Sequence, residues 1–217
     1  MAIDYLESFV ETPFDYRHCC WFCAEPSQHY FTFPHAKHLV IACIHPTVTV
    51  PSCKECKDIA VKVKADDIYA VHAQVKTSLI KRYQKDLAIG LNWTKQSLEE
   101  SQFEGGNFES FQKSAWFMYE VARDRVNFKS WPLVLNGLRI TDNLADQRFT
   151  FDGVTYPTIG QAIKYYSQTY RIDSEFVKAL IAVLTEAQFA RAISIARINL
   201  QATPQEKRAI LQQLASV

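Results

Sequence analysis

The sequence predicts an α+β protein that is mainly helical, with a small N-terminal four-cysteine zinc-knuckle module followed by a helical domain containing one β-hairpin. Three observations lead to this prediction. All six cysteines of the 217-residue chain lie between Cys19 and Cys56. Apolar residues beyond position 66 recur at spacings of three and four, which is typical of helix faces. Residues 148–156 combine alternating β-forming residues with a two-residue turn, Asp152-Gly153.

These patterns predict two domains, a zinc-binding module over residues 1–65 and a helical domain over residues 66–217. Hydrophobic residues make up 48% and charged residues 22% of the chain, which argues against disorder and is enough to build a core. The net charge is only +1, so the total composition does not indicate a strongly basic nucleic-acid binder.

Neither a membrane span nor an export signal is expected. No segment approaches the roughly 18 consecutive apolar residues that a spanning helix needs. Residues 1–16 contain no Lys or Arg and no long apolar run, so we expect no secretory signal and a cytoplasmic location. Because thiols are kept reduced in that compartment, metal binding is a better explanation for the cysteines than disulfides.

Four of the cysteines form two C-x-x-C pairs, Cys20 with Cys23 and Cys53 with Cys56. Two residues between thiols let both sulfurs converge on one cation, and two such turns complete a tetrahedral Zn²⁺ site. With four protein ligands the zinc would be structural, contributing on the order of 10 kcal/mol to folding. A redox pair is the alternative for a single C-x-x-C, and Cys19 or a nearby histidine could replace one ligand.

The two C-x-x-C pairs, which we call the knuckles, and the residues between them resemble the zinc-stabilised HNH endonucleases. The resemblance covers residues 17–65 and rests on Cys20-Trp-Phe-Cys23, on Lys37-His38-Leu-Val, and on Val-Pro-Ser-Cys53-Lys-Glu-Cys56. It implies a ββα-metal unit in which the knuckles hold a structural zinc and a hairpin and helix hold a separate catalytic ion. His38 would then take the place of the general base that activates water.

This sequence departs from the family pattern around that catalytic ion. Lys37 stands where the family has a carboxylate ligand, and Lys57 stands where it has Asn. No Asp or Glu lies between Glu25 and Glu55, although a hard cation prefers oxygen ligands. These departures indicate that the module, although it resembles the family, is catalytically degenerate. Whether the chain is an enzyme stays open; an HNH-type nuclease is one alternative, with His38 and His45 as the residues to test.

The rest of the chain is expected to be helical. A long helix over residues 66–89 would begin at a cap on Asp66 or Asp67 and stop at Gly90, with Lys76 on its polar face. A second would begin at Asn107, and Trp116 and Phe117 would widen its buried face. Four short helices are expected at the C-terminus, over residues 159–170, 174–184 and 185–200 and from Thr203-Pro204 onward.

Local charge suggests a partner. Residues 54–95 contain nine bases and five acids, and the phosphate contacts of a nucleic acid would fall on Lys54, Lys57, Lys62, Lys64, Lys81, Arg82 and Lys85. The favoured function is a non-catalytic, zinc-binding protein with a nucleic-acid partner. The alternative is an adaptor in which the zinc module and the aromatic helices dock another protein. No glycine-rich nucleotide motif is present, so no nucleotide cofactor is expected.

Overall fold

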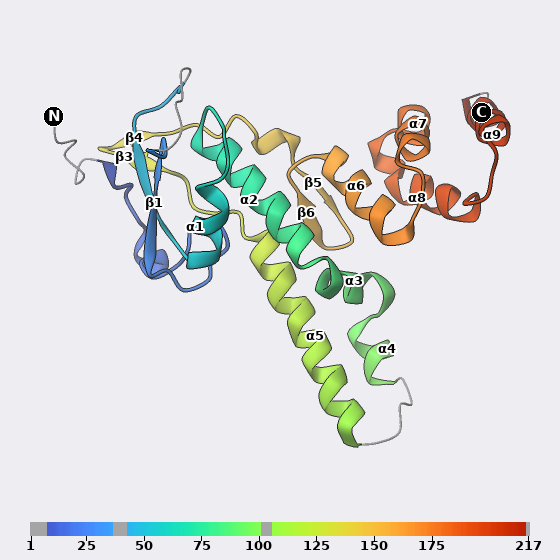
Figure 1. Ribbon diagram of the computed structural model, residues 1–217, viewed down its shortest axis with the longest axis horizontal. Coiled ribbons are helices and arrows are strands. Elements are labelled where there is room, and N and C mark those ends of the chain that lie inside the picture. Colours follow the sequence, from blue (N-terminus) through green and yellow to red (C-terminus); the bar gives the residue numbers. More distant parts are fainter. Residues whose placement is uncertain (1–7, 37–42, 101–105, 216–217) are drawn as a thin grey trace. The chain divides into compact units, whose positions relative to one another are not determined.

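We describe the fold from a computed structural model, in which residues 8–36, 43–100 and 106–215 are described (Figure 1). The chain divides into two compact units, Met1–Pro157 and Thr158–Val217. The fold class is confirmed, since helices predominate and the strands form three two-stranded antiparallel sheets in the described part. The boundary expected at residue 65 falls inside the first unit, because the knuckles pack against helices that follow it.

The first unit holds all the strands of the described chain and five α-helices. Its elements are η2 (Phe14–Tyr16), β1 (His29–Phe33), β2 (Val48–Ser52), α1 (Lys54–Ala60), α2 (Ile68–Arg82), α3 (Gln84–Asn92), α4 (Lys95–Glu99), α5 (Gly106–Asn127), β3 (Val134–Leu135), β4 (Leu138–Arg139), η3 (Ala145–Gln147), β5 (Phe149–Phe151) and β6 (Val154–Tyr156). No helix of the described residues has the length and apolarity needed to cross a membrane.

The β1–β2 hairpin forms one wall of the core around the cysteines. Phe31 pairs with Val50, and Phe33 pairs with Val48. These four side chains are at most 3% exposed, so the paired positions share one buried face. The strand β2 leads directly into α1, which places the second C-x-x-C pair at the end of the hairpin.

The helix expected over residues 66–89 is two helices. Asp67 caps α2 as predicted, accepting a hydrogen bond from the Ala70 amide at 2.8 Å. The helix ends at Arg82, however, and Gly90 lies inside α3 rather than at a helix stop. A Cβ on Gly90 would lie 2.2 Å from the Tyr119 ring, so glycine is needed there for the close approach of α3 to α5.

Two further expectations for these helices are wrong. Lys76 is only 4% exposed, because α5 covers the face of α2 on which it lies and supplies a hydrogen-bond acceptor, the Arg125 carbonyl oxygen. On α5, Phe117 is 61% exposed, so it does not belong to the buried face formed by Tyr119, Ala122 and Val126.

The second unit comprises short helices that pack through apolar faces: α6 (Ile159–Tyr170), α7 (Ser174–Leu184), η4 (Glu186–Gln188), α8 (Phe189–Ile198) and α9 (Pro204–Ala215). The caps predicted at Thr158 and Asp173 are confirmed by side-chain hydrogen bonds to helix amides. The helix expected over residues 185–200 starts at Phe189, because Thr185 has a positive φ of 72° and the next three residues form a 3₁₀ turn.

Candidate metal centre

The sulfurs of Cys20, Cys23, Cys53 and Cys56 all lie within 4.8 Å of one another. Cys23 Sγ and Cys53 Sγ are 3.8 Å apart, which excludes a disulfide between them. This sulfur–sulfur distance equals the spacing expected between two ligands of a tetrahedral site, about 3.8 Å when each metal–sulfur bond is near 2.3 Å. The two C-x-x-C pairs therefore meet as predicted, and the donor set fits a single metal ion.

The first pair is held by a tight turn that is anchored in the core. The Cys23 and Ala24 amides both donate to the Cys20 carbonyl, and Ala24 takes a positive φ of 63° to close the turn. The two intervening residues, Trp21 and Phe22, are fully buried and pack against the His72 ring of α2. The turn that presents the sulfurs thus also supplies the largest apolar side chains beneath them.

The second pair is presented by the first turn of α1. Cys53 is the N-cap residue of this helix, and its sulfur accepts a hydrogen bond from the Cys56 amide at 3.4 Å. Cys56, one turn further along, is fully buried. Because an amide hydrogen bond stabilises the anionic form of a sulfur, this arrangement favours thiolate ligands.

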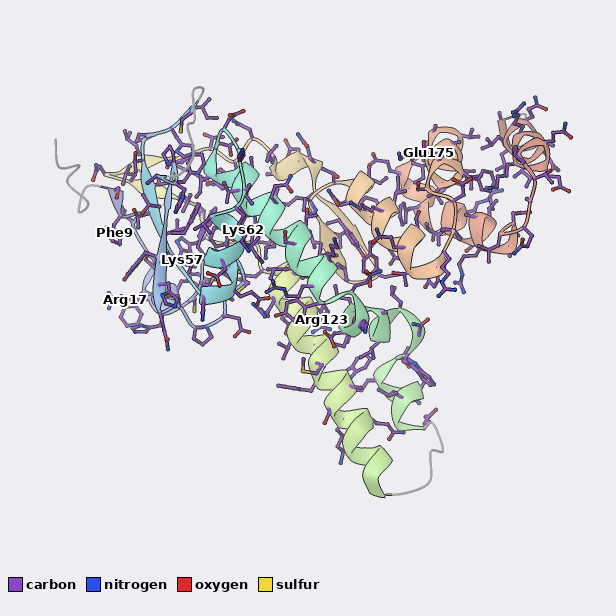
Figure 2. All side chains as sticks on the ribbon, viewed as in Figure 1. Phe9, Arg17, Lys57, Lys62, Arg123 and Glu175 are labelled. Atoms are coloured by element: carbon purple, nitrogen blue, oxygen red, sulfur yellow. The ribbon has the colours of Figure 1, made fainter. Side chains whose placement is uncertain are left out.

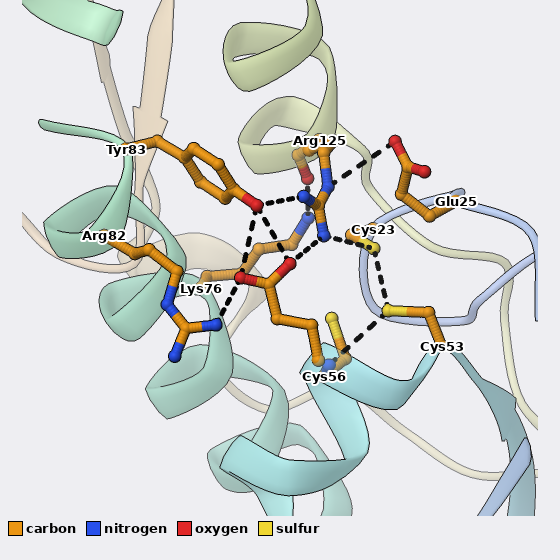
Figure 3. Close-up of polar contacts among 9 residues, drawn as sticks. Cys23, Glu25, Cys53, Cys56, Lys76, Arg82, Tyr83 and Arg125 are labelled. Atoms are coloured by element: carbon orange, nitrogen blue, oxygen red, sulfur yellow. Dashed lines mark hydrogen bonds and ion pairs between the residues drawn. The ribbon is translucent and has the colours of Figure 1, made fainter. Parts of the chain in front are cut away.

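A polar network continues from the sulfurs to α2 and α5 (Figure 3). Arg125 of α5 donates to Cys23 Sγ at 3.6 Å and, from the same nitrogen, to Glu55 of α1 at 2.6 Å. The other oxygen of Glu55 accepts from Arg82 at 2.5 Å. Tyr83 donates to Glu55 and accepts from Arg125. Arg125 therefore connects the metal site to the helices that surround it.

The charges of this network shift the pKa values of its members. Burial opposes the ionisation of Glu55, but hydrogen bonds from Arg125, Arg82 and Tyr83 outweigh it and lower the pKa of the carboxyl group. Burial and the neighbouring Glu55 raise the pKa of Tyr83 to about 12. Glu55 is thus a carboxylate and Tyr83 a neutral phenol at neutral pH, as their hydrogen bonds require.

The four thiols also influence each other's ionisation. Hydrogen bonds from the neighbouring thiols, led by Cys20, lower the pKa of Cys23, and the Cys20 thiol likewise lowers the pKa of Cys53 to about 7. Burial raises the pKa of Cys20, and hydrogen bonding within the cluster raises that of Cys56. The four thiols thus titrate as one group, and a metal would displace the protons that they carry.

The other candidate ligands lie outside this cluster. Cys19 forms a β-bridge with Pro26, and Cys43 donates to the His45 carbonyl, so neither joins the four sulfurs. No histidine of the described residues joins them either. His45 accepts a hydrogen bond from the Ile68 amide through Nε2, at the start of α2. His38 and Lys37 lie outside the described residues.

The predicted nucleic-acid contacts lie on two adjoining parts of the first unit. Lys54 and Lys57 are on α1, next to the cysteines, whereas Lys81, Arg82 and Lys85 lie around the junction of α2 and α3. The Arg82–Glu55 ion pair at 2.5 Å joins the two parts. We call these five residues, together with Lys62 and Lys64, the basic patch; Lys57 and Lys62 are labelled in Figure 2.

Sequence reasoning missed Glu55, Tyr83 and Arg125. Glu55 was visible only as one of the residues between Cys53 and Cys56, and Tyr83 fitted an apolar helical stripe. Arg125 lies more than one hundred residues from Cys23, its sulfur partner. A buried arginine on a helix rich in aromatic residues would have been the only signal, and its burial is not evident from the sequence.

Comparison with family models, curated proteins and solved structures finds no match to this chain.

Proposed function

We propose that this protein is a zinc-stabilised, non-catalytic nucleic-acid-binding protein that contacts phosphates through the basic patch. One observation carries the proposal. The six lysines of the basic patch are exposed or half-exposed, and none forms an ion pair with a carboxylate among the described residues. Unpaired lysines on neighbouring helices can release counterions from a phosphate backbone, which is the main source of affinity in such complexes.

Zinc is the metal that best suits the donor set. Four sulfur ligands select soft or borderline ions, and zinc is the one that commonly fills a closed, tetrahedral structural site. Elemental analysis of the purified chain should find close to one zinc per chain, and a change of Cys56 to Ser should lower that ratio sharply. Iron or no metal in place of zinc would contradict this part of the proposal.

The metal site and the basic patch are linked through α1. Lys54 and Lys57 each follow a cysteine of the second pair directly, so the metal would fix the start of the helix that presents them. The Arg125–Glu55–Arg82 contacts then hold the second part of the patch against α1. Removal of the metal is therefore expected to weaken nucleic-acid binding as well as to destabilise the fold.

Fluorescence anisotropy with a labelled DNA duplex, a DNA single strand and an RNA hairpin tests the proposed partner. Binding through about five phosphate contacts should give a log–log salt dependence with a slope of roughly −4 to −5 for the duplex. Changing Lys54, Lys57, Lys81 and Lys85 together to Gln should weaken binding and flatten the slope. An affinity that does not change between low and moderate salt would refute the proposal.

A matched control for this variant changes two lysines of the second unit. Lys164 and Lys178 are exposed residues of the second unit, and changing both to Gln removes charge from a region outside the basic patch. This double variant should bind as the unchanged protein does. If it weakened binding as much as the basic-patch variant did, then total charge rather than the basic patch would be responsible.

A protein-interaction adaptor is the second candidate function, and one observation favours it. Phe117 and Met118 are adjacent on α5 and are 61% and 42% exposed, which is unusual for large apolar side chains. An adaptor should retain its partner in a pull-down after nuclease treatment. Changing both residues to Ser should abolish that retention while leaving nucleic-acid binding intact.

Nuclease activity of the HNH type is the remaining alternative. The antiparallel β1–β2 hairpin followed by α1 has the element order that the resemblance implies. In the described parts of the chain, however, the four cysteines are the only group of metal-binding side chains. Nicking of plasmid DNA with added Mg²⁺ or Mn²⁺, abolished by His38→Ala, would support this alternative, and no cleavage across metals and substrates would remove it.

A further inference from the structure

A second charged site lies in the first unit, outside the basic patch. Two adjoining hollows share Tyr69, His72, Lys129 and Arg148 among their lining residues. The smaller has a volume of about 40 Å³ and the larger about 240 Å³. None of the basic-patch lysines lines either hollow. We call the two hollows together the inner pocket.

The inner pocket is strongly cationic. Lys76 lines the smaller hollow, Arg139 lines the larger, and Lys129 and Arg148 line both. Asp142 is the single carboxylate among the lining residues, and it pairs with Arg148 at 2.5 Å. The positive charge therefore exceeds the negative charge within a space bounded by α2, the segment after α5 and the segment before β5.

Lys76 is the most informative of these residues. Its side chain is 4% exposed, and its ammonium group donates one hydrogen bond, to the Arg125 carbonyl at 2.8 Å, and lies 5.8 Å from the centre of the Phe128 ring. An ammonium has three donors, and burial of a charge with unused donors is unfavourable. Burial accordingly lowers the pKa of Lys76 to about 7. The charges of Lys76 and Arg148, after burial itself, also lower the pKa of His72, so these groups lie within electrostatic reach of one another.

An independent observation comes from Trp131, which lines the larger hollow. Its side chain is 4% exposed, and its indole N–H has no hydrogen-bond partner among the described residues. Buried donors in native structures are nearly always paired. Each hollow thus holds a buried donor, on Lys76 or on Trp131, that lacks a full set of acceptors among the described residues.

We propose that the inner pocket binds a phosphoryl group, with the larger hollow taking the organic part of a phosphate monoester. A volume of about 40 Å³ holds on the order of three water molecules, which is close to the size of one tetrahedral oxyanion. Lysine and arginine side chains that converge from different elements suit an anion with several oxygens. Tyr69 and Trp131 provide aromatic walls in the larger hollow.

The cysteine cluster is the competing explanation for the charge of Lys76. The sulfurs of Cys23, Cys56 and Cys20 favour its charged form from a distance, but none of them forms a hydrogen bond with it in the described part of the chain. As a counter-charge to the metal site, Lys76 would support zinc retention and not anion binding. The two explanations therefore predict different losses when its charge is removed.

Isothermal titration calorimetry on the full-length, metal-loaded protein tests the proposal, with inorganic phosphate and adenosine monophosphate titrated separately at constant ionic strength. Phosphate should bind saturably with one site per chain. Lys76→Met should weaken binding roughly tenfold or more, and Arg148→Gln should weaken it severalfold. Lys164→Met, the same change at an exposed position of the second unit, should have no effect.

The outcomes separate the sources of the phosphoryl group and the rival explanation. Tighter binding of the monophosphate than of phosphate would assign a monoester, whereas equal or weaker binding would assign free phosphate. If Lys76→Met disturbed the fold, as judged by tryptophan fluorescence, the test would rest on Arg148→Gln alone. The Arg148 side chain is 29% exposed, so its replacement should leave the fold intact. No saturable phosphate binding, or unchanged binding in both variants, would overturn the proposal. Its failure would leave the basic patch untouched, because the two sites share no residue.

Discussion

The two units of this chain are stabilised in different ways. In the first, four cysteines and a network of charged side chains join three helices, and the two side chains between Cys20 and Cys23 are part of the apolar core. In the second, the described helices pack through aliphatic and aromatic side chains such as Phe176, Leu180 and Phe189. No cysteine or tryptophan occurs in that unit. The comparison indicates that a metal should control one unit and leave the other largely unaffected.

The difference also has a practical use. All four tryptophans, Trp21, Trp93, Trp116 and Trp131, belong to the first unit, so tryptophan fluorescence reports on it alone. Far-UV circular dichroism reports on the helices of both units. The two signals together can follow metal-dependent and metal-independent structure in the intact chain.

The largest expected effect is that of metal removal. Chelation, or a change of Cys56 to Ser, should unfold the first unit, because a structural zinc site contributes on the order of 10 kcal/mol to folding. Tryptophan emission should shift to longer wavelength, while part of the helical circular dichroism, that of the second unit, should remain. Adding zinc back to the chelated protein should restore the emission.

Cys43→Ser provides the control for that experiment. Cys43 lies outside the cluster, and a serine hydroxyl can replace the hydrogen bond that its thiol donates to the His45 carbonyl at 3.0 Å. The variant should keep both its zinc content and its fluorescence. Retention of tertiary structure by the Cys56→Ser variant without metal would show that the two units do not differ in the way stated.

Removal of Arg125 is expected to have the next largest effect. Its side chain is 11% exposed, and a change to Met would remove the cationic partner of the Cys23 sulfur and one of the two arginines that pair with Glu55. Because Glu55 keeps its pair with Arg82, the loss should lie at the low end of the range for a broken buried ion pair, about 3 kcal/mol. Urea titration of the metal-loaded protein, followed by tryptophan fluorescence, should show the loss.

Arg123→Met is the matched change on the same helix. Arg123 is 33% exposed and pairs with its neighbour Asp124, which is 69% exposed, so its loss should change the midpoint little. If both variants shifted the urea midpoint equally, the effect would come from α5 itself and not from the network at the metal site.

A cavity in the second unit should affect the circular dichroism and not the tryptophan fluorescence, which is the reverse of the effect expected for metal removal. Leu180 is fully buried on α7, and a change to Ala should destabilise this unit by about 3 kcal/mol. The helical circular dichroism should begin to melt earlier, whereas the fluorescence midpoint of the first unit should stay unchanged. Leu200→Ala, at a side chain that is 50% exposed, serves as the control. A fluorescence midpoint that moved with Leu180→Ala would show that the units unfold together.

The same contrast explains how much of the structure could be predicted from the sequence. In the second unit, helix starts at Thr158 and Asp173 and the opening at Thr203-Pro204 were predicted correctly, because a capping side chain acts on amides only two or three residues away. The four metal ligands were also accessible, since the C-x-x-C spacing is a local pattern.

The predictions that were wrong concern residues whose environment is set by contacts with parts of the chain far away in sequence. The burial of Lys76 and the close approach at Gly90 both depend on α5, which follows these residues in sequence. Arg125 could not be assigned to the metal site because nothing near it in the chain indicates Cys23 as a partner. Local patterns specify caps and knuckles, whereas packing between helices specifies which polar side chains become buried.

The smallest expected effect concerns the cap of α7. Asp173 accepts hydrogen bonds from the Glu175 and Phe176 amides and pairs with Lys207 of α9 at 2.7 Å. The Lys207 ammonium group, with the helix amides, lowers the pKa of Asp173 below its ordinary value of 3.8. Because the folded pKa is the lower one, the contribution is fully present above pH 3.8 and is lost as the pH falls through the folded value.

Two substitutions separate the cap from the charge. Asp173→Asn keeps a capping oxygen but loses the exposed ion pair, so it should cost only a few tenths of a kcal/mol. Asp173→Ala loses both and should cost about 1 kcal/mol. Thermal melts followed by circular dichroism should show this order at neutral pH, and the Asp173→Asn protein should approach the unchanged protein in stability as the carboxyl group is protonated. An equal loss in the two variants would show that the charge, and not the capping oxygen, holds the start of α7.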